Sequence, residues 1–303
     1  MQRVVTIIGP TGVGKSALAL KLAGALKAEI ISADSRQIYR SLDIGTAKAT
    51  KAEQELVRHH LIDIVAPDED FSLAQYQQMA YQAIDDINAR HKLPLLVGGS
   101  GLYVWAVLEG WQIPKVAPDA ALRRELEARA ASGEAAQLYA ELQQLDSEAA
   151  ARIDPRNVRR VIRALEIGHQ PQKNAPPSKV TPSFEQMVIG LTCPRDALYN
   201  RIDKRVDIML QQGLTDEVRR LLERGYKADL PAMSGIGYRQ MVAFLNGKVS
   251  QEEAVQQIKF ESHGLARQQY NWFSLKNATI HWFNVTEDYY ERAFVAVSEF
   301  INK

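Results

Sequence analysis

The feature that most constrains the fold is a glycine-rich segment near the start of the chain, GPTGVGKS at residues 9–16. It matches the pattern GxxxxGK[ST] and lies between an apolar run at residues 4–8 and a helix-like run at residues 17–26. A strand, a glycine loop and a helix in this order are typical of a phosphate-binding loop, whose N–H groups turn inward beside the positive end of the helix dipole. The residues expected to hold the phosphates are Gly9, Pro10, Thr11, Gly12, Val13, Gly14, Lys15 and Ser16.

Lys15 and Ser16 give this loop its expected chemistry. The lysine adds a full positive charge, and the Ser16 hydroxyl is placed to hold a Mg²⁺ that bridges phosphate oxygens. An ordinary glycine turn with a surface lysine is the alternative, but the flanking pattern agrees with the motif. The motif predicts a ligand with at least two linked phosphates and leaves open whether a phosphoryl group is transferred.

The composition is that of a folded protein without disulfide bonds. The chain has 303 residues, 46% of them apolar, and a net charge of +1, so any contact with nucleic acid must come from local basic patches. Its single cysteine, Cys193, permits no internal disulfide and fits a reducing compartment. Residues 1–3 lead directly into the first apolar run, and no segment has the length of a membrane span. We therefore expect a soluble cytoplasmic protein.

Short apolar runs alternate with helical patterns along most of the chain. The predicted strands are residues 4–8, 29–32, 61–65, 94–97, 187–191 and 280–283. A strand and a helix in alternation indicate a parallel sheet with helices on both faces. The predicted fold class is therefore α/β, a P-loop NTPase-like doubly wound parallel sheet in the style of nucleoside monophosphate kinases, with a helical insertion domain.

Two polar segments follow predicted strands and are expected at the ligand-binding edge of the sheet. Asp34 comes after the strand at 29–32, and the glycine-rich stretch at 98–101 follows the strand at 94–97. Asp34 faces the phosphate loop in this interpretation, with a helix cap or turn as the alternative. A motor ATPase uses an acidic residue at the end of a strand for its metal, but Asp63 lies inside the predicted strand at 61–65 and Val97 is followed by glycine, which argues against that class.

Adjacent histidines at His59 and His60 raise the question of a metal site. Side chains one residue apart diverge on a strand, and no cysteine or third histidine lies at ligand spacing. Structural or hydrogen-bonding roles are therefore favoured.

The character of the sequence changes between residues 115 and 183. This segment has no convincing strand, is rich in helix-forming residues and ends in a proline-rich linker at residues 171–182. We predict that residues 1–114 and 184–303 form the catalytic core with its C-terminal helices and that residues 115–183 form the insertion domain. Five arginines crowd within it and suit a sugar-phosphate backbone, or else a solvated, salt-bridged helix face: Arg152, Arg156, Arg159, Arg160 and Arg163.

The remaining sequence contains a glycine-bearing turn at residues 234–240 and a long helix at residues 251–273. The turn suits either a packing corner or a contact with backbone phosphates. The aromatic residues that end the helix, Tyr270, Trp272 and Phe273, are expected in the core.

Several segments together resemble one known family. GPTGVGKS, ISADSRQIYRSLDIGTAK, HHLIDI, LLVGGSGLY, RALEI and GIGYRQM occur in the order seen in bacterial tRNA dimethylallyltransferases, also called tRNA isopentenyltransferases. The resemblance covers almost the whole chain. It implies transfer of a dimethylallyl group from dimethylallyl diphosphate to the exocyclic N6 amine of the adenosine 3′ of the anticodon, with Mg²⁺ as cofactor and release of diphosphate.

The resemblance also implies roles for individual residues. Asp34 accepts the N6 proton, Arg205 stabilises the leaving diphosphate, and Ser100, where the family usually has threonine, lies near the oxygen that joins the allyl group to the diphosphate. The positions that match tRNA contacts, with the anticodon stem-loop as partner, are Asp34, Ser35, Arg36, Gln37, Ser100, Arg123, Arg159, Arg160, Val161, Ile162, Arg163, Ser234, Gly235, Ile236, Gly237, Tyr238 and Arg239.

The long C-terminal helix departs from the family pattern. Many relatives carry a basic KRQ-type run there, whereas this chain has Arg267, Gln268 and Gln269, and His263 and Ser274 stand where arginine is common. Contacts from this helix to RNA or diphosphate are therefore not expected to follow the family.

The resemblance favours a monomeric tRNA-prenylating enzyme over three alternatives. An adenylate isopentenyltransferase, which prenylates AMP, ADP or ATP, needs no RNA-binding insertion. A small-molecule kinase would need only the phosphate loop, and a non-catalytic RNA-binding module leaves that loop unexplained.

Overall fold

The computed structural model describes residues 2–113, 119–169 and 179–303. The chain divides into two compact units, one made of Met1–Gly110 with Thr181–Lys303 and the other of Trp111–Val180. Lys115 and residues 170–178, which include most of the predicted proline-rich linker, lie outside the described residues.

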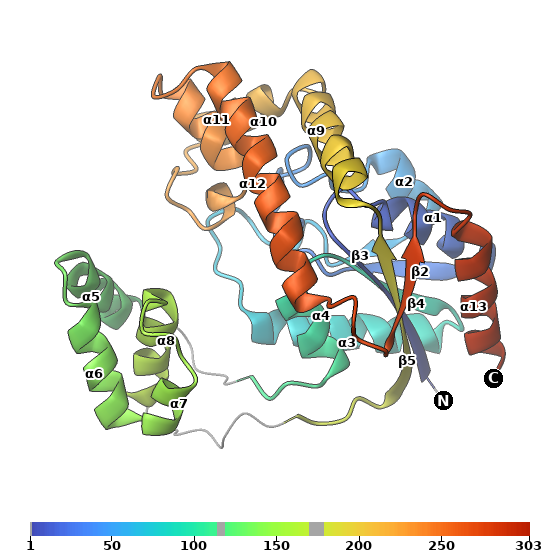
Figure 1. Ribbon diagram of the computed structural model, residues 1–303, viewed down its shortest axis with the longest axis horizontal. Helices are drawn as coiled ribbons and strands as arrows, with labels where there is room; N and C mark the ends of the chain where they lie inside the picture. Colours follow the sequence, from blue (N-terminus) through green and yellow to red (C-terminus); the bar gives the residue numbers. More distant parts are fainter. Residues whose placement is uncertain (1, 114–118, 170–178) are drawn as a thin grey trace. The chain divides into compact units, whose positions relative to one another are not determined.

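A parallel sheet of six strands forms the centre of the larger unit (Figure 1). The strand order is β3-β2-β4-β1-β5-β6, and every pairing is parallel, which confirms the predicted fold class. The strands are β1 (Gln2–Ile8), β2 (Ala28–Ser32), β3 (His59–His60), β4 (Leu93–Val97), β5 (Phe184–Thr192) and β6 (Ile280–Asn284). The strand that leads into the phosphate loop, β1, thus lies between β4 and β5 and is buried on both faces.

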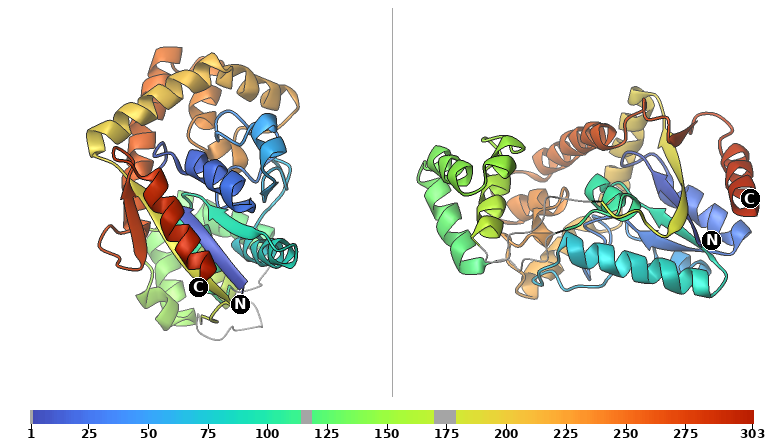
Figure 2. Two further views of the ribbon diagram at one scale, coloured as in Figure 1. Left: turned by 90° about the vertical axis from the view of Figure 1, so that its right-hand side faces the viewer. Right: turned by 90° about the horizontal axis from the view of Figure 1, so that it is seen from below.

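Alternation along β1 divides the interior of this unit into two cores. Val4 and Ile8 pack into one core with residues of α3 (Leu73–Ala89) and α4 (Gly101–Leu108). Val5 and Ile7 point to the other face, where α1 (Lys15–Leu26) and α13 (Tyr290–Asn302) cover the sheet. Helices on both faces are what a doubly wound sheet requires. The two chain ends lie at the same side of this unit (Figure 2).

The other helices of this unit have clear starts and ends. A capping box of Ser72 and Gln75 starts α3, and Gly213 separates the helix at residues 195–211 from the helix at residues 214–223. The remaining helices are α2 (Lys51–Leu56), α9 (Arg195–Gln211), α10 (Leu214–Glu223), the short 3₁₀ helix η1 (Ala232–Ser234), α11 (Tyr238–Leu245) and α12 (Gln251–Trp272).

One predicted strand is wrong. Residues 61–65 were expected to be extended, but the strand is only His59–His60, and the residues after it form a turn with one isolated bridge from Val65 to Tyr39. The backbone of Leu61 and Asp63 has φ of 62° and 55°, in the left-handed region that a strand does not use. The turn places the Asp63 carboxylate 2.6 Å from Lys48 Nζ, in a partly buried ion pair. Residues 61–65 therefore do not form the backbone hydrogen bonds with β2 expected of a strand.

Helices joined by turns make up the described residues of the smaller unit, apart from one bridge between Trp111 and Lys179. Its helices are α5 (Ala120–Ala131), α6 (Ala135–Leu145), α7 (Ser147–Ala151) and α8 (Val158–Gly168). A core of its own forms from α5, α6, α7 and α8, with Leu138 and Leu165 fully buried.

Across the described ranges, no helix is both long and apolar enough to cross a membrane.

Candidate active site

The phosphate loop has the predicted geometry. Gly9, Gly12 and Gly14 have φ of 143°, 78° and 111°, a region that side chains disfavour, and a Cβ on Gly9 would lie 2.5 Å from the Leu191 carbonyl oxygen. Helix α1 begins at Lys15, and its N-cap, Gly14, supplies no side chain to cover the first-turn N–H groups. The helix start is therefore open to an anion.

Lys15 is the first residue of α1 and is half-buried. Its ammonium donates a hydrogen bond of 2.9 Å to the Pro10 carbonyl oxygen. Burial, and next the charge of Arg205, lower the pKa of Lys15 to about 7, while Asp34 acts in the opposite direction. An anionic ligand would restore the full charge of this lysine.

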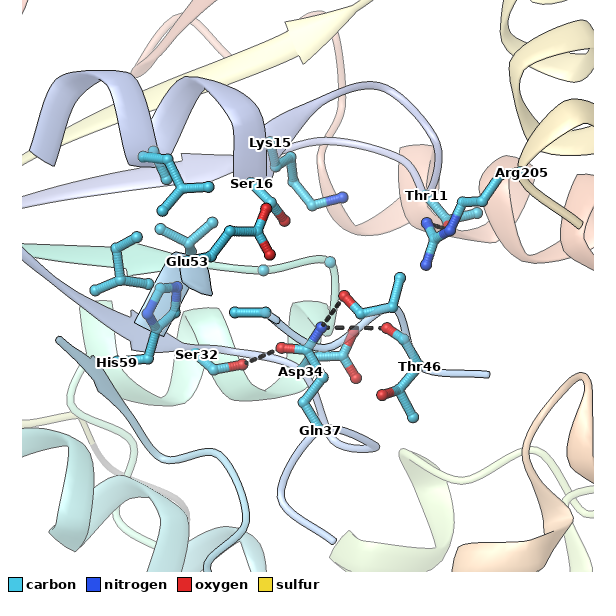
Figure 3. A pocket seen from close by; sticks show the side chains of 18 of the residues that line it. Thr11, Lys15, Ser16, Ser32, Asp34, Gln37, Thr46, Glu53, His59 and Arg205 are labelled. Carbon is cyan, nitrogen blue, oxygen red and sulfur yellow. Dashed lines mark hydrogen bonds between the residues drawn. The ribbon is translucent and has the colours of Figure 1, made fainter. Parts of the chain in front are cut away.

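Arg205, on α9, brings a second half-buried cation to the same place (Figure 3). Its Nη1 donates a 3.0 Å hydrogen bond to the Thr11 hydroxyl, and its buried Nε has no partner among the described residues. Burial lowers the pKa of Arg205, and Asp34 opposes that shift. Two half-buried cations with unused donor capacity suit a multiply charged anion.

Asp34 lies just beyond the end of β2, at the carboxyl edge of the sheet. One carboxylate oxygen, Oδ1, accepts a 2.8 Å hydrogen bond from the Arg36 N–H. The turn interpretation therefore holds, and so does the prediction that the side chain faces the phosphate loop, because Asp34 lines a pocket together with Lys15 (Figure 3).

Two pockets meet at Asp34. The first holds Lys15 and Ser16, and the second opens past Ser100 and the turn at residues 234–239. The residues that line both are Thr11, Asp34, Thr46, Gly99, Arg205, Leu265 and Gln269. The arrangement offers a site for a phosphate-bearing group on one side of the Asp34 carboxylate and a site for a second molecule on the other.

Ser100 is part of the wall of the second pocket and stands at the N-cap position of α4. Its hydroxyl oxygen accepts a 3.0 Å hydrogen bond from the Ser35 N–H and lies 3.4 Å from the Ser35 hydroxyl. The loop that carries Asp34 is thus fastened to the loop after β4.

The predicted tRNA-contacting residues of the larger unit gather around the second pocket. Arg36 Nη2 donates a 3.2 Å hydrogen bond to the Ser234 hydroxyl, and Arg239 pairs with Glu261. Gln37 instead turns toward the first pocket, where its side chain accepts from the Ser32 hydroxyl at 2.9 Å. The second-pocket members of this set are Asp34, Ser35, Arg36, Ser100, Ser234, Gly235, Ile236, Gly237, Tyr238 and Arg239.

In the smaller unit the structure separates the predicted RNA contacts into two groups. Arg159 and Arg160 are exposed on α8, whereas Val161 and Ile162 are buried in the core of the unit. Helical periodicity turns the Val161 and Ile162 side chains inward, and RNA contact at these two positions stays a prediction. Arg123 and Arg163 lie 2.8 Å and 3.2 Å from the same buried carboxylate oxygen of Glu166.

The histidine pair has the hydrogen-bonding role that the sequence favoured. His60 Nε2 lies 2.7 Å from Glu29 Oε2, and His59 Nδ1 lies 2.7 Å from the Val57 carbonyl oxygen. Within the described ranges, no group of three or more histidine, cysteine or carboxylate side chains is arranged to hold a metal ion.

A magnesium ion held partly by phosphate oxygens needs only a few protein ligands, and the first pocket offers them. Ser16, Asp34 and Glu53 all line it and present hard oxygen donors. This donor set fits Mg²⁺ when a diphosphate supplies the other ligands.

Sequence reasoning missed two buried polar residues at the site. Gln269, on α12, accepts a 2.7 Å hydrogen bond from the Thr11 N–H and donates a 3.0 Å bond to the Gly99 carbonyl oxygen. Glu217, on α10, accepts from the N–H groups of residues 43–45. The polar residue type at a position of α12 that the helical period turns inward was the available signal for Gln269.

The aromatic end of α12 is only partly in the core. Phe273 is fully buried as predicted, but Trp272 is 40% exposed. Its indole lies against Gly101, where a Cβ would clash with it, and lines the second pocket. The prediction of a core role for Trp272 is therefore wrong. The indole packs in the space that a side chain on Gly101 would fill, and this position lies in the wall of the second pocket.

The family model described as IPP transferase matches residues 37–276. A tRNA dimethylallyltransferase of Dehalococcoides mccartyi is 49% identical over 292 residues, which cover 94% of this chain and 88% of the relative. A tRNA dimethylallyltransferase of Roseiflexus castenholzii is 54% identical over 278 residues, 89% of either chain.

Solved structures give a concordant result. The tRNA isopentenylpyrophosphate transferase of Bacillus halodurans has a TM-score of 0.73 at 42% identity and covers 100% of this chain and 96% of its own. A eukaryotic dimethylallyltransferase described as acting on tRNA has a TM-score of 0.85 at 26% identity, covering 100% of this chain and 80% of its own.

Proposed function

The chain belongs to the IPP transferase family of tRNA-prenylating enzymes, and from this we propose how its two joined pockets divide the reaction. Dimethylallyl diphosphate binds in the first pocket, and the adenosine 3′ of the tRNA anticodon enters through the second. The dimethylallyl group passes to the exocyclic N6 amine, and diphosphate is released. The observation that carries this division is that Asp34 lines both pockets.

The first pocket suits a diphosphate leaving group. Cleavage of the C–O bond leaves negative charge on the diphosphate while positive charge grows on the allyl carbon. In this proposal the backbone N–H groups of Lys15 and Ser16, the Lys15 ammonium and Arg205 stabilise the former, and loss of one such donor typically costs about 3–4 kcal/mol. The unpaired Nε of Arg205 supports a direct role for that guanidinium.

Asp34 serves as the base. The N6 amine of adenine is a weak nucleophile because its lone pair is shared with the ring, so orientation and proton removal both matter. With Oδ1 held by the Arg36 N–H, the carboxylate has a fixed orientation toward the pocket. It accepts a hydrogen bond from N6 and then takes the proton as the new N–C bond forms.

Ser100 and Mg²⁺ complete the site in this proposal. In this proposal the Ser100 hydroxyl, which lies in the wall of the second pocket, contacts the oxygen that joins the allyl group to the diphosphate. Ser16, with Glu53 in the same pocket, would hold the metal, which leaves Asp34 free to act as the base. Bound there, Mg²⁺ supplies charge that offsets the negative charge of the departing diphosphate.

The tRNA is held through its backbone and by extraction of the target base. Enzymes that modify a stacked base generally withdraw it into a pocket, and the second pocket serves this purpose. Arg36, Arg239 and the turn at residues 234–239 contact the anticodon loop at its mouth. In the smaller unit, which we propose as the insertion domain, Arg159 and Arg160 contact the sugar-phosphate backbone, with Arg123 and Arg163 behind them. We further propose that the enzyme acts as a monomer in the cytoplasm.

Mass spectrometry of tRNA incubated with the protein, labelled dimethylallyl diphosphate and Mg²⁺ tests this function. We expect a labelled adenosine at the position 3′ of the anticodon and one equivalent of free diphosphate. Prenylation of AMP, ADP or ATP in place of tRNA would support an adenylate isopentenyltransferase instead. Release of ADP from ATP would point to a kinase.

A further inference from the structure

Gln269 bridges the two glycine-bearing loops of the site. Its buried amide joins the Thr11 N–H of the phosphate loop to the Gly99 carbonyl oxygen of the loop after β4, through bonds of 2.7 Å and 3.0 Å. Only 7% of the residue is exposed. Because it accepts from one loop and donates to the other, a primary amide fits this position and an ionised carboxylate does not.

Three further features tie this bridge to the reacting groups. Thr11 is held a second time, because its hydroxyl accepts from Arg205 Nη1 at 3.0 Å. Gly99 directly precedes Ser100, and a Cβ on Gly99 would clash with the Gln269 amide nitrogen. Gln269 also lines both pockets. A continuous hydrogen-bonded path therefore runs from Gly99 through Gln269 and Thr11 to Arg205.

We propose that Gln269 is a positioning residue that locks the diphosphate side of the site to the acceptor side. It fixes the distance between the phosphate loop and the loop that carries Ser100. It also occupies the Thr11 N–H, so that the diphosphate must take its backbone hydrogen bonds from N–H groups further along the loop. This inference rests on the proposed function of the two pockets.

Gln269→Glu is the informative substitution, because it conserves shape while removing the donor. At pH 8 the ionised carboxylate would repel both the Gly99 carbonyl oxygen and a bound diphosphate. We expect kcat with tRNA to fall about a hundredfold, since the Gly99 carbonyl oxygen loses its donor and the carboxylate brings a negative charge next to the diphosphate. Burial raises the pKa of such a carboxyl, and its protonated form can donate as the amide does. The kcat of Gln269→Glu, divided by the kcat of the protein without the substitution, should therefore rise as the pH is lowered toward about 5.5.

Gln257→Glu is the matched control, since Gln257 is an exposed residue of the same helix. Its activity ratio should stay near one at every pH. If Gln269→Glu has the same kcat at pH 8 as the protein without the substitution, the inference is overturned. So would a lowered activity ratio that does not change with pH, because a role in packing alone predicts such a flat profile.

Titration calorimetry with inorganic diphosphate separates this inference from the proposed function. We expect about tenfold weaker binding by Gln269→Glu at pH 8 and unchanged binding by Gln257→Glu. If the unmodified protein fails to prenylate tRNA, the proposed function fails while this measurement still decides the role of Gln269. Should Gln269→Glu not fold, Gly99→Ala gives the second test, because its Cβ displaces the amide. Equal diphosphate affinity and kcat in that variant would contradict the bridge.

Discussion

Glu217 and Tyr238 meet in the interior through a 2.6 Å hydrogen bond from the tyrosine hydroxyl to the carboxylate. The same carboxylate accepts from the N–H groups of Asp43, Ile44 and Gly45, at 3.1, 2.8 and 3.2 Å. Burial, and then the Glu217 charge, raise the pKa of Tyr238 well above its usual value. One acidic side chain of α10 thus fastens the loop at residues 43–45 to the first residue of α11, and both line the second pocket through Gly45 and Tyr238.

Replacing Glu217 by alanine should destabilise the fold. The change leaves a buried hydroxyl and three backbone N–H groups without their acceptor, and we expect the free energy of unfolding to fall by about 3–5 kcal/mol. Urea denaturation measures this loss. Glu223→Ala, at an exposed position of the same helix, should change it by less than about 0.5 kcal/mol. A loss below about 1 kcal/mol for Glu217→Ala would mean that water replaces the carboxylate.

Replacing Asp34 by alanine should reduce turnover without a comparable loss of tRNA binding. Removal of a general base typically costs about a hundredfold or more in kcat. Single-turnover kinetics with labelled dimethylallyl diphosphate measure the rate, and filter binding measures tRNA affinity. Asp68→Ala, at an exposed loop position, is the control. Near-normal turnover by Asp34→Ala would remove this residue from the role of base.

Diphosphate binding should be accompanied by proton uptake above neutral pH. The pKa of Lys15 lies at about 7 in the free protein, so the ammonium loses its proton as the pH rises through that value. A bound anion favours the charged form, and at pH 8 binding should therefore draw in about one proton per site, falling toward none at pH 6.

Calorimetry with inorganic diphosphate in two buffers of different ionisation enthalpy measures this uptake. Lys15→Arg should abolish the lysine contribution, because a guanidinium stays charged throughout this range. The titration of diphosphate itself is common to both proteins. Equal proton uptake by the two would show that Lys15 is already charged in the free site.

The Arg159→Ala, Arg160→Ala double variant should weaken tRNA binding and flatten its dependence on salt. Both side chains are exposed, so the fold should be preserved. If each contacts the RNA backbone, the slope of log K against log salt concentration should decrease in magnitude by about 1–2. The control is the Arg219→Ala, Arg292→Ala double variant, which removes the same charge from the larger unit. An unchanged slope for Arg159→Ala, Arg160→Ala would show that these two arginines form a solvated helix face and do not contact the RNA backbone.

Local patterns were sufficient to predict most of the fold. The phosphate loop could be identified because its glycines, lysine and serine are consecutive, and the strand and helix around it share the same short segment. Asp34 was placed correctly from one general property, the meeting of strand carboxyl ends at one edge of a parallel sheet. The strand at residues 61–65 was wrong because left-handed turns at Leu61 and Asp63 leave no mark in an apolar pattern.

Residues that act through distant partners could not be predicted in this way. Gln269 contacts Thr11 across 258 positions of sequence, and Glu217 contacts Asp43 across 174, so no local spacing indicates either bond. The arginine cluster was interpreted as one face, yet the same helical period that exposes Arg159 and Arg160 buries Val161 and Ile162. A contact predicted for a whole helical segment must therefore be assessed residue by residue, according to the face of the helix on which each side chain lies.

The place of β1 between β4 and β5 has a consequence for substrate affinity. The phosphate loop, which we propose binds the leaving group, directly follows β1. This strand has a neighbouring strand on each edge and a hydrophobic core on each face. A loop anchored in this way is already ordered before a substrate arrives, so little of the binding energy is lost in immobilising the loop. The energy that the substrate provides by docking can then be used to draw a purine out of its stack.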